Sequence, residues 1–229
     1  LYAYNIPVAT NGVKLETDTV LKLANEGVIQ GLKDSSGNDA GIRAVVLGAQ
    51  KMGLNEFVVL TGSELTVDSA LMAGAHGVVP GIGNIDPVGY VKIFNLVAAG
   101  DYKAARAEQE RLTEMFGLVD VGAPGRMGRG SSALGAFKAS LQLLGIIEDG
   151  RTAPPQIPLN SDEIAAIVPF LKIAGLSVKY WNNKFSQFGV LAGIVNIAFL
   201  RWLLLHLVES SLFTMLDLIL MIFQARLIL

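Results

Sequence analysis

The residue with the clearest chemical potential in this sequence is a lysine at the end of an apolar run. Lys33 stands within Gly31-Leu32-Lys33-Asp34-Ser35-Ser36-Gly37-Asn38 and is followed at once by small hydroxylic residues and glycine. In parallel α/β architectures, side chains at the carboxyl ends of strands face the mouth of the active site. A partly desolvated amine there can attack a ketone and form an imine. This segment alone favours equally a solvated lysine held in an ion pair.

A tyrosine ends the apolar run that precedes Lys33 in the chain. Tyr4 belongs to Tyr4-Asn5-Ile6-Pro7, and two adjacent parallel strands would bring it to the same rim as Lys33. A phenol in that position can relay protons to and from a carbinolamine or a substrate hydroxyl. Taken alone, a lone tyrosine at a strand end is more often explained by packing.

Alternating strand and helix patterns position these two residues. Short apolar runs followed by turn residues predict strands at 1–6, 28–32, 57–60 and 77–79, and segments of helical period predict helices at 17–26, 39–52 and 66–73. This alternation is typical of a parallel sheet covered by crossover helices. It predicts the second half of a (β/α)8 barrel, or a doubly wound sheet.

Further along the chain the strand patterns stop and helices dominate. Helical periods predict helices near residues 88–99, 102–115, 132–144 and 161–174, separated by Gly- and Pro-rich breaks. The predicted domains are therefore a half barrel at 1–90, a C-terminal helical bundle at 91–176 and an apolar helical tail of uncertain origin at 177–229.

The apolar tail has three interpretations. The stretch 188–208 is long enough for a membrane span, but it contains Arg201, and a central arginine costs about 2.5–3.5 kcal/mol on insertion. The alternatives are helices that bind a partner, or a stretch that does not belong to the domain. We favour the last, because a domain with its own polar surface ends before it. Membrane contact is expected only through residues 185–229.

Charge and composition exclude several classes of function. With 18 basic and 20 acidic residues the net charge is −2, so no basic surplus is available for a nucleic-acid backbone. There is no cysteine, and the two histidines, His76 and His206, lie far apart, so we expect no metal site. The sequence starts at Leu1 with neither a methionine nor a secretory signal pattern, so we expect a piece whose beginning lies elsewhere, and we expect the protein to be cytoplasmic.

Together, the Tyr4-Asn5-Ile6-Pro7 and Gly31 to Asn38 segments resemble the dihydrodipicolinate synthase and N-acetylneuraminate lyase family over residues 1–176. The resemblance implies that pyruvate or another 2-keto acid forms an imine with Lys33 and that Tyr4 acts in acid–base catalysis. It implies no metal or organic cofactor, and a homo-oligomer. The family's first four strands, with the loop that binds the carboxylate of pyruvate, would lie before Leu1.

The resemblance also suggests substrate-binding positions. Ser35 and Ser36 could hold substrate hydroxyls, or cap the following helix. Gly62 and Glu64 lie where sugar-acid aldolases bind the substrate tail, although Glu64 could equally cap the next helix. The main chain around Val79 and Gly81 is expected near pyruvate.

Two departures from the family pattern bear on the substrate. Synthases carry an arginine shortly after the Tyr-Asn-x-Pro segment, where this chain has Val8-Ala9-Thr10-Asn11-Gly12, and Gly81 replaces a serine of sialate lyases. We therefore expect a class I aldolase or dehydratase that acts on 2-keto-3-deoxy acids. A 4-hydroxy-tetrahydrodipicolinate synthase is one alternative, and an inactive fragment or a membrane- or partner-binding protein that works through its tail is another.

Overall fold

Four parallel strands in chain order form the central sheet. The computed structural model describes residues 1–179, which make up one compact unit. The strands are β1 (Tyr2–Asn5), β2 (Gly31–Asp34), β3 (Val58–Thr61) and β4 (Gly77–Val78), and each pairs with the next. The predicted parallel sheet is confirmed.

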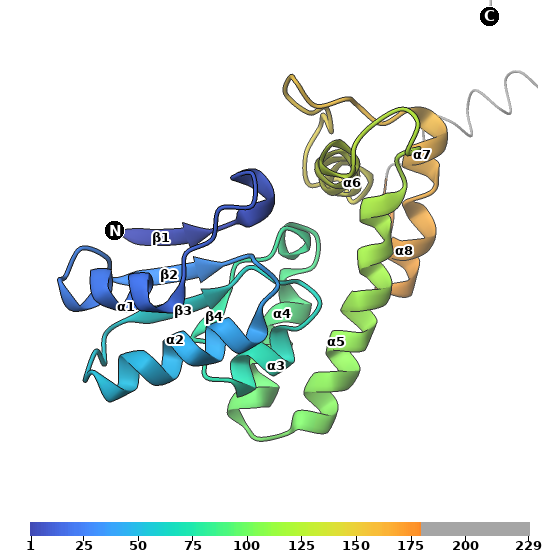
Figure 1. Ribbon diagram of the computed structural model, residues 1–229. Coiled ribbons are helices and arrows are strands. Elements are labelled where there is room, and N and C mark those ends of the chain that lie inside the picture. The colour runs from blue at the N-terminus through green and yellow to red at the C-terminus, as the bar shows by residue number, and fades with distance from the viewer. Residues whose placement is uncertain (180–229) are drawn as a thin grey trace, which may run out of the picture. The chain divides into compact units, whose positions relative to one another are not determined.

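A helix follows each strand, as parallel connections require. These helices are α1 (Thr17–Asn25), α2 (Asp39–Lys51), α3 (Val67–Met72) and α4 (Pro87–Ala98). Side-chain caps begin two of them, because Asn38 accepts a hydrogen bond from the Gly41 amide and Asp86 from the Gly89 amide. The sheet and its helices thus make four consecutive βα units (Figure 1).

One hydrophobic core cluster lies between one face of the sheet and helices α1 and α2, which run side by side along it (Figure 1). Its buried residues come from both layers: Val20, Ala24, Ile29, Leu32, Ile42, Val45, Val46, Ala49, Phe57, Val59, Ala70 and Ala75. Because side chains alternate along a strand, the neighbours of Leu32 and Val59 must point to the other face. That second face is the one that carries Lys33.

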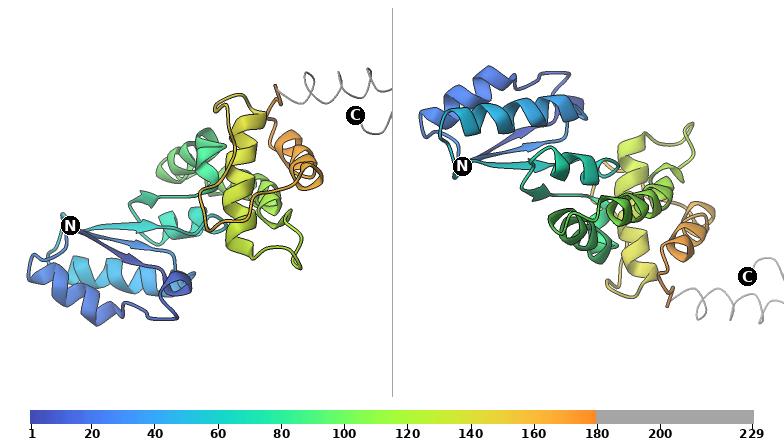
Figure 2. Two further views of the ribbon diagram at one scale, coloured as in Figure 1. Left: turned by 90° about the horizontal axis from the view of Figure 1, so that it is seen from above. Right: turned by 90° about the horizontal axis from the view of Figure 1, so that it is seen from below.

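The remaining helices gather on the side toward which the strands point (Figures 1 and 2). They are α5 (Tyr102–Phe116), α6 (Arg129–Leu143), α7 (Ser161–Ala165) and α8 (Val168–Ile173). Short 3-10 turns, η1 (Pro7–Ala9), η2 (Ile82–Asn84) and η3 (Gly117–Asp120), complete the described chain. The carboxyl ends of the strands therefore face a helical layer.

Several predicted boundaries differ from the observed ones by one to three residues, and two of the differences change the description of the fold. The second strand was expected at 28–32, but it begins at Gly31, because Gly27 has a positive φ of 71° and Val28 is 47% exposed in the turn that follows. Lys33 consequently lies within the strand. The single helix expected at 161–174 is two helices, because Pro169 lacks the N–H that would bond the carbonyl of Ala165.

Of the apolar tail predicted at 177–229, residues 180–229 lie outside the described residues. None of the helices described up to residue 179 is long and apolar enough to cross a membrane. The division into a barrel half at 1–90 and a bundle at 91–176 stays a prediction.

Candidate active site

The structure brings Tyr4 and Lys33 into direct contact on the open face of the sheet. The two residues are register partners on β1 and β2, so their side chains leave the sheet side by side. Lys33 Nζ donates a hydrogen bond to Tyr4 Oη at 3.1 Å, and it lies 4.2 Å from the centre of the ring. The phenol is 46% exposed, so a small molecule can reach the pair.

Ser35 joins this pair because it lies two residues beyond Lys33 and so shares its face. Its hydroxyl donates to Tyr4 Oη at 3.2 Å. Burial raises the pKa of Tyr4, but the hydrogen bonds from Ser35 and Lys33, with the charge of Lys33, hold that pKa below its ordinary value. At a given pH, a larger fraction of the Tyr4 hydroxyl is therefore ionised, and able to take up a proton, than of an isolated tyrosine.

Gly62 leaves the space that these side chains occupy. A β-carbon at this position would lie 1.9 Å from Ser35 Oγ and 3.1 Å from Lys33 Cε. The Gly62 amide donates to the carbonyl of Asp34 at 2.6 Å, which continues the ladder between β2 and β3 past their last paired residues. Any larger residue would push the serine away from the phenol.

Glu64 supplies a carboxylate to the same rim. Its Oε1 accepts a hydrogen bond from the Ile82 amide, so it does not cap α3. Burial raises the pKa of Glu64 above its ordinary value, although backbone hydrogen bonds from Ile82 and Gly81 and the charge of Lys33 oppose this shift. A carboxyl group that gains a proton easily can donate to, or accept from, substrate hydroxyls.

Val79 and Gly81 belong to the loop after β4, which also contains Ile82, the residue that Glu64 bonds. A β-carbon on Gly81 would lie 2.7 Å from the ring of Phe137 on α6 and 3.3 Å from Glu64 Oε1, so only glycine allows this approach. The Val79 amide donates to the carbonyl of Thr61 at 2.9 Å, and the Val79 side chain is 46% exposed. Both residues follow β4 at the carboxyl end of the sheet.

Ser36 does not reach the group around Lys33. It follows Ser35 directly, so it points to the opposite face, where its hydroxyl donates to Asp34 Oδ1 at 2.6 Å. Nor does it cap α2, because Asn38 has that role. The other Asp34 oxygen accepts from Asn5 Nδ2 at 2.7 Å.

Sequence reasoning missed this second polar cluster of Asn5, Asp34 and Ser36. Its signal was available, because Asn5 and Asp34 directly follow Tyr4 and Lys33 in two paired strands. Both are buried, at 5% and 7% exposure. They fix the strand ends just behind the reactive pair.

No cluster suited to a metal ion occurs among residues 1–179. His76 has a structural contact instead, since its Nδ1 accepts a hydrogen bond from the Val59 amide at 3.0 Å. This bond extends the pairing of β3 and β4.

The sequence profile of the Dihydrodipicolinate synthetase family matches residues 2–174. A 4-hydroxy-tetrahydrodipicolinate synthase of Kineococcus radiotolerans is 29% identical over 76% of this chain and 52% of its own length. Another from Anaeromyxobacter is 30% identical over 72% of this chain and 51% of its own length. The chain thus spans about half the length of the curated relatives it matches.

Solved structures share the fold. Dihydrodipicolinate synthase from Bacteroides thetaiotaomicron superimposes with a TM-score of 0.67 at 29% identity, over 75% of this chain and 55% of that one. YagE, a prophage protein from E. coli K12 solved in complex with pyruvate, gives a TM-score of 0.66 at 23% identity, over 77% of this chain and 56% of that one. The four βα units therefore correspond to part of the barrel of these proteins.

Proposed function

Because the chain belongs to the dihydrodipicolinate synthetase family, whose members are lyases and synthases, we propose that Lys33 forms an imine with pyruvate or another 2-keto acid. The observation that carries this proposal is the contact between Lys33 Nζ and Tyr4 Oη at 3.1 Å. A protonated lysine amine must pass a proton to a nearby group before it can attack a carbonyl. Tyr4 is that group in this arrangement.

The reaction begins when the neutral Lys33 amine attacks the keto carbon and forms a carbinolamine. Tyr4 returns a proton to the carbinolamine hydroxyl, which leaves as water, and the protonated imine remains. In the cleavage direction, the ionised Tyr4 takes the proton of the C4 hydroxyl of the substrate, the C3–C4 bond breaks to release an aldehyde, and the electron pair of that bond passes to the positive nitrogen, which leaves an enamine. Protonation of the enamine and addition of water then release the 2-keto acid and restore the amine. Ser35 holds the phenol toward Lys33 throughout.

We propose a 2-keto-3-deoxy acid with a hydroxylated tail as the substrate. Glu64 follows β3 at the same end of the sheet as this pair, near enough for the charge of Lys33 to act on it, and a carboxyl group suits substrate hydroxyls better than it suits a second carboxylate. The segment Val8 to Gly12 offers no arginine for such a carboxylate. The reaction is then an aldol cleavage or a dehydration.

A 4-hydroxy-tetrahydrodipicolinate synthase is the second candidate, since the curated relatives at 29–30% identity carry that name. The two candidates differ in the aldehyde that pyruvate condenses with. Faster condensation with glyceraldehyde than with a carboxylated aldehyde supports the first candidate, and the reverse preference supports the second.

Trapping of the imine tests the mechanism. The purified chain is incubated with pyruvate and borohydride, and its intact mass and peptides are measured. We expect one adduct, on Lys33, and none in the variant Lys33→Arg. Lys14→Arg is the matched control, because Lys14 lies apart from Lys33, in a pocket that Asp34 and Ser36 also line, and it should be labelled as the wild type is.

Tyr4→Phe separates the role of the tyrosine from that of the lysine. We expect labelling to slow by about 10²-fold or more, as loss of a proton-transfer group does. A folded wild-type chain that gains no mass on Lys33 would refute the imine mechanism for this chain.

A further inference from the structure

A buried glutamine on α5, Gln109, bonds the loop that contains Glu64 through both the nitrogen and the oxygen of the glutamine side-chain amide. Gln109 Nε2 donates to the backbone carbonyl of Glu64 at 3.0 Å. Gln109 Oε1 accepts from the amides of Val67 at 2.9 Å and Asp68 at 3.4 Å. The residue is only 5% exposed, so these bonds are shielded from water. One side chain therefore bonds both the start and the end of a short turn.

The turn needs this support because α3 has no side-chain cap of its own. The residue at its N-cap, Thr66, makes no capping bond, and its single hydroxyl proton is directed to Ser63 at 2.9 Å, with Asp39 further away at 3.3 Å. The first amides of a helix have no partner within the helix. Gln109 accepts from two of them, and so replaces a local cap by a contact from the helical layer.

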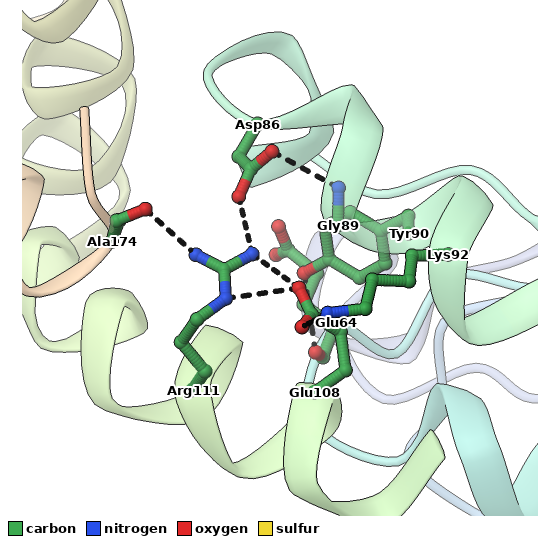
Figure 3. Close-up of polar contacts among 8 residues, drawn as sticks. All are labelled: Glu64, Asp86, Gly89, Tyr90, Lys92, Glu108, Arg111 and Ala174. Carbon is green, nitrogen blue, oxygen red and sulfur yellow. Dashed lines mark hydrogen bonds and ion pairs between the residues drawn. The ribbon is translucent and has the colours of Figure 1, made fainter. Parts of the chain in front are cut away.

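A tyrosine on α4 bonds the same carbonyl. The hydroxyl of Tyr90 donates to the backbone oxygen of Glu64 at 3.2 Å, and Figure 3 shows its ring beside Glu64. The backbone of Glu64 is thus held from α4 and α5, while its carboxylate accepts from the Ile82 amide. Small shifts of this backbone would move the carboxylate relative to Lys33.

We propose that Gln109 is a positioning residue that sets the place of the Glu64 carboxylate and thereby the preference for hydroxylated tails. This inference rests on the proposed function for its consequence in substrate selection. Its structural part, the coupling from Gln109 through Glu64 to Ile82, is independent of any activity.

Amide hydrogen exchange tests the coupling directly. Gln109→Met keeps the length of the side chain and removes all of its polar contacts. We expect exchange at Val67 and Asp68 to accelerate, and exchange at Ile82, which Gln109 does not contact, to accelerate about tenfold, the factor for a lost bond of about 1.4 kcal/mol. A purely local role of Gln109 would leave Ile82 unchanged, and that result would overturn the proposal.

Gln142→Met is the matched control. Gln142 on α6 has the same kind of contacts, since its Nε2 donates to the Glu148 carbonyl and its Oε1 accepts from the Gly150 amide. Its replacement should leave exchange at Ile82 unchanged. If both variants accelerate Ile82 equally, the coupling is not specific and the proposal fails.

A second variant guards against misfolding. Gln109→Glu keeps an acceptor for Val67 and Asp68 but loses the donor to Glu64. We expect Val67 to stay protected while Ile82 exchanges faster. Faster exchange at Val67 with no change at Ile82 would overturn the proposal.

Imine trapping then tests the consequence for substrates. We measure the concentration of each keto acid that gives half-maximal borohydride labelling at Lys33. In Gln109→Met this concentration should change less than twofold for pyruvate and rise about tenfold for 2-keto-3-deoxygluconate. Equal changes for the two probes would refute a role in tail selection. Absence of labelling in the wild type would count against the proposed function, whereas hydrogen exchange at Ile82 would still decide on the coupling.

Discussion

Replacement of Arg111 by methionine is expected to destabilise the fold more than loss of any surface ion pair on the same helix. Arg111 lies on α5, and its guanidinium connects three elements (Figure 3). It donates to Glu108 at 2.9 Å on its own helix, to Asp86 at 2.6 Å before α4, and to the carbonyl of Ala174 at 3.0 Å after α8.

The magnitude follows from what the substitution leaves behind. The side chains of Asp86 and Glu108 are only 7% exposed, and removal of one partner from a buried pair costs about 3–5 kcal/mol. Each acid keeps one partner, because Lys92 bonds Glu108 at 2.7 Å and the Gly89 amide bonds Asp86 at 3.0 Å. Arg111 is also 28% exposed. We therefore expect a loss at the lower end, about 3 kcal/mol.

Urea unfolding followed by circular dichroism measures this loss. Arg106→Met is the matched control, since Arg106 pairs with Glu110 on the same helix and both side chains are exposed, at 76% and 61%. That variant should lose no more than about 0.5 kcal/mol. Arg111→Met combined with Asp86→Asn should lose less than the sum of the two single variants, because the same interaction is removed twice.

Equal losses for Arg111→Met and Arg106→Met would refute the reasoning. Such a result would mean that solvent screens the three-way contact as it screens a surface pair. A loss that disappears in 1 M salt would lead to the same conclusion, because partly buried pairs are screened less than exposed ones.

Three further substitutions probe the candidate site. Gly62→Ala should slow labelling of Lys33 by borohydride and pyruvate at least tenfold, since its methyl group would take the place of Ser35 Oγ; normal labelling would argue against this crowding. Ser35→Ala should slow labelling more than Ser36→Ala does, because only Ser35 lies on the reactive face; equal rates would contradict that assignment. Urea titrations give the free energy of unfolding of the wild type minus that of Glu64→Gln. This difference should be highest below pH 4.5 and should fall as the pH rises through the raised pKa of Glu64. A difference that does not change with pH would contradict the shift.

The period of two along paired strands made the central pair predictable. Apolar runs placed Tyr4 and Lys33 at the ends of neighbouring strands, and the register confirms that they face each other. The same period places Ser35 and Ser36 on opposite faces. The predicted strand ended too early, at residue 32, so this difference between the two serines was not predicted. With the strand placed at Gly31–Asp34, alternation alone assigns Ser36 to the opposite face.

Contacts from distant helices could not be predicted in this way. Gln109 lies 45 residues from Glu64, on a helix whose sequence pattern shows only that one side is apolar and the other charged. In the sequence, Gln109 does not differ from any other polar residue of a helix. Its role depends on the contact between α5 and the turn after β3, which only the structure gives. The ion pairs of Arg111 raise the same difficulty, because α5 carries two arginines and three glutamates at helical spacing, and burial alone distinguishes the network from the surface pair of Arg106.

The helical layer thus has two distinct effects on the candidate site. Tyr4, Lys33 and Ser35 are aligned by the sheet itself, through register and alternation, so their geometry requires nothing from α5. Glu64 lies beyond the last paired residue of β3, where no ladder holds it, and its position depends on contacts from α4 and α5. Substitutions in the helical layer should therefore alter the choice of substrate tail while leaving imine formation intact, and substitutions in the strands should do the reverse.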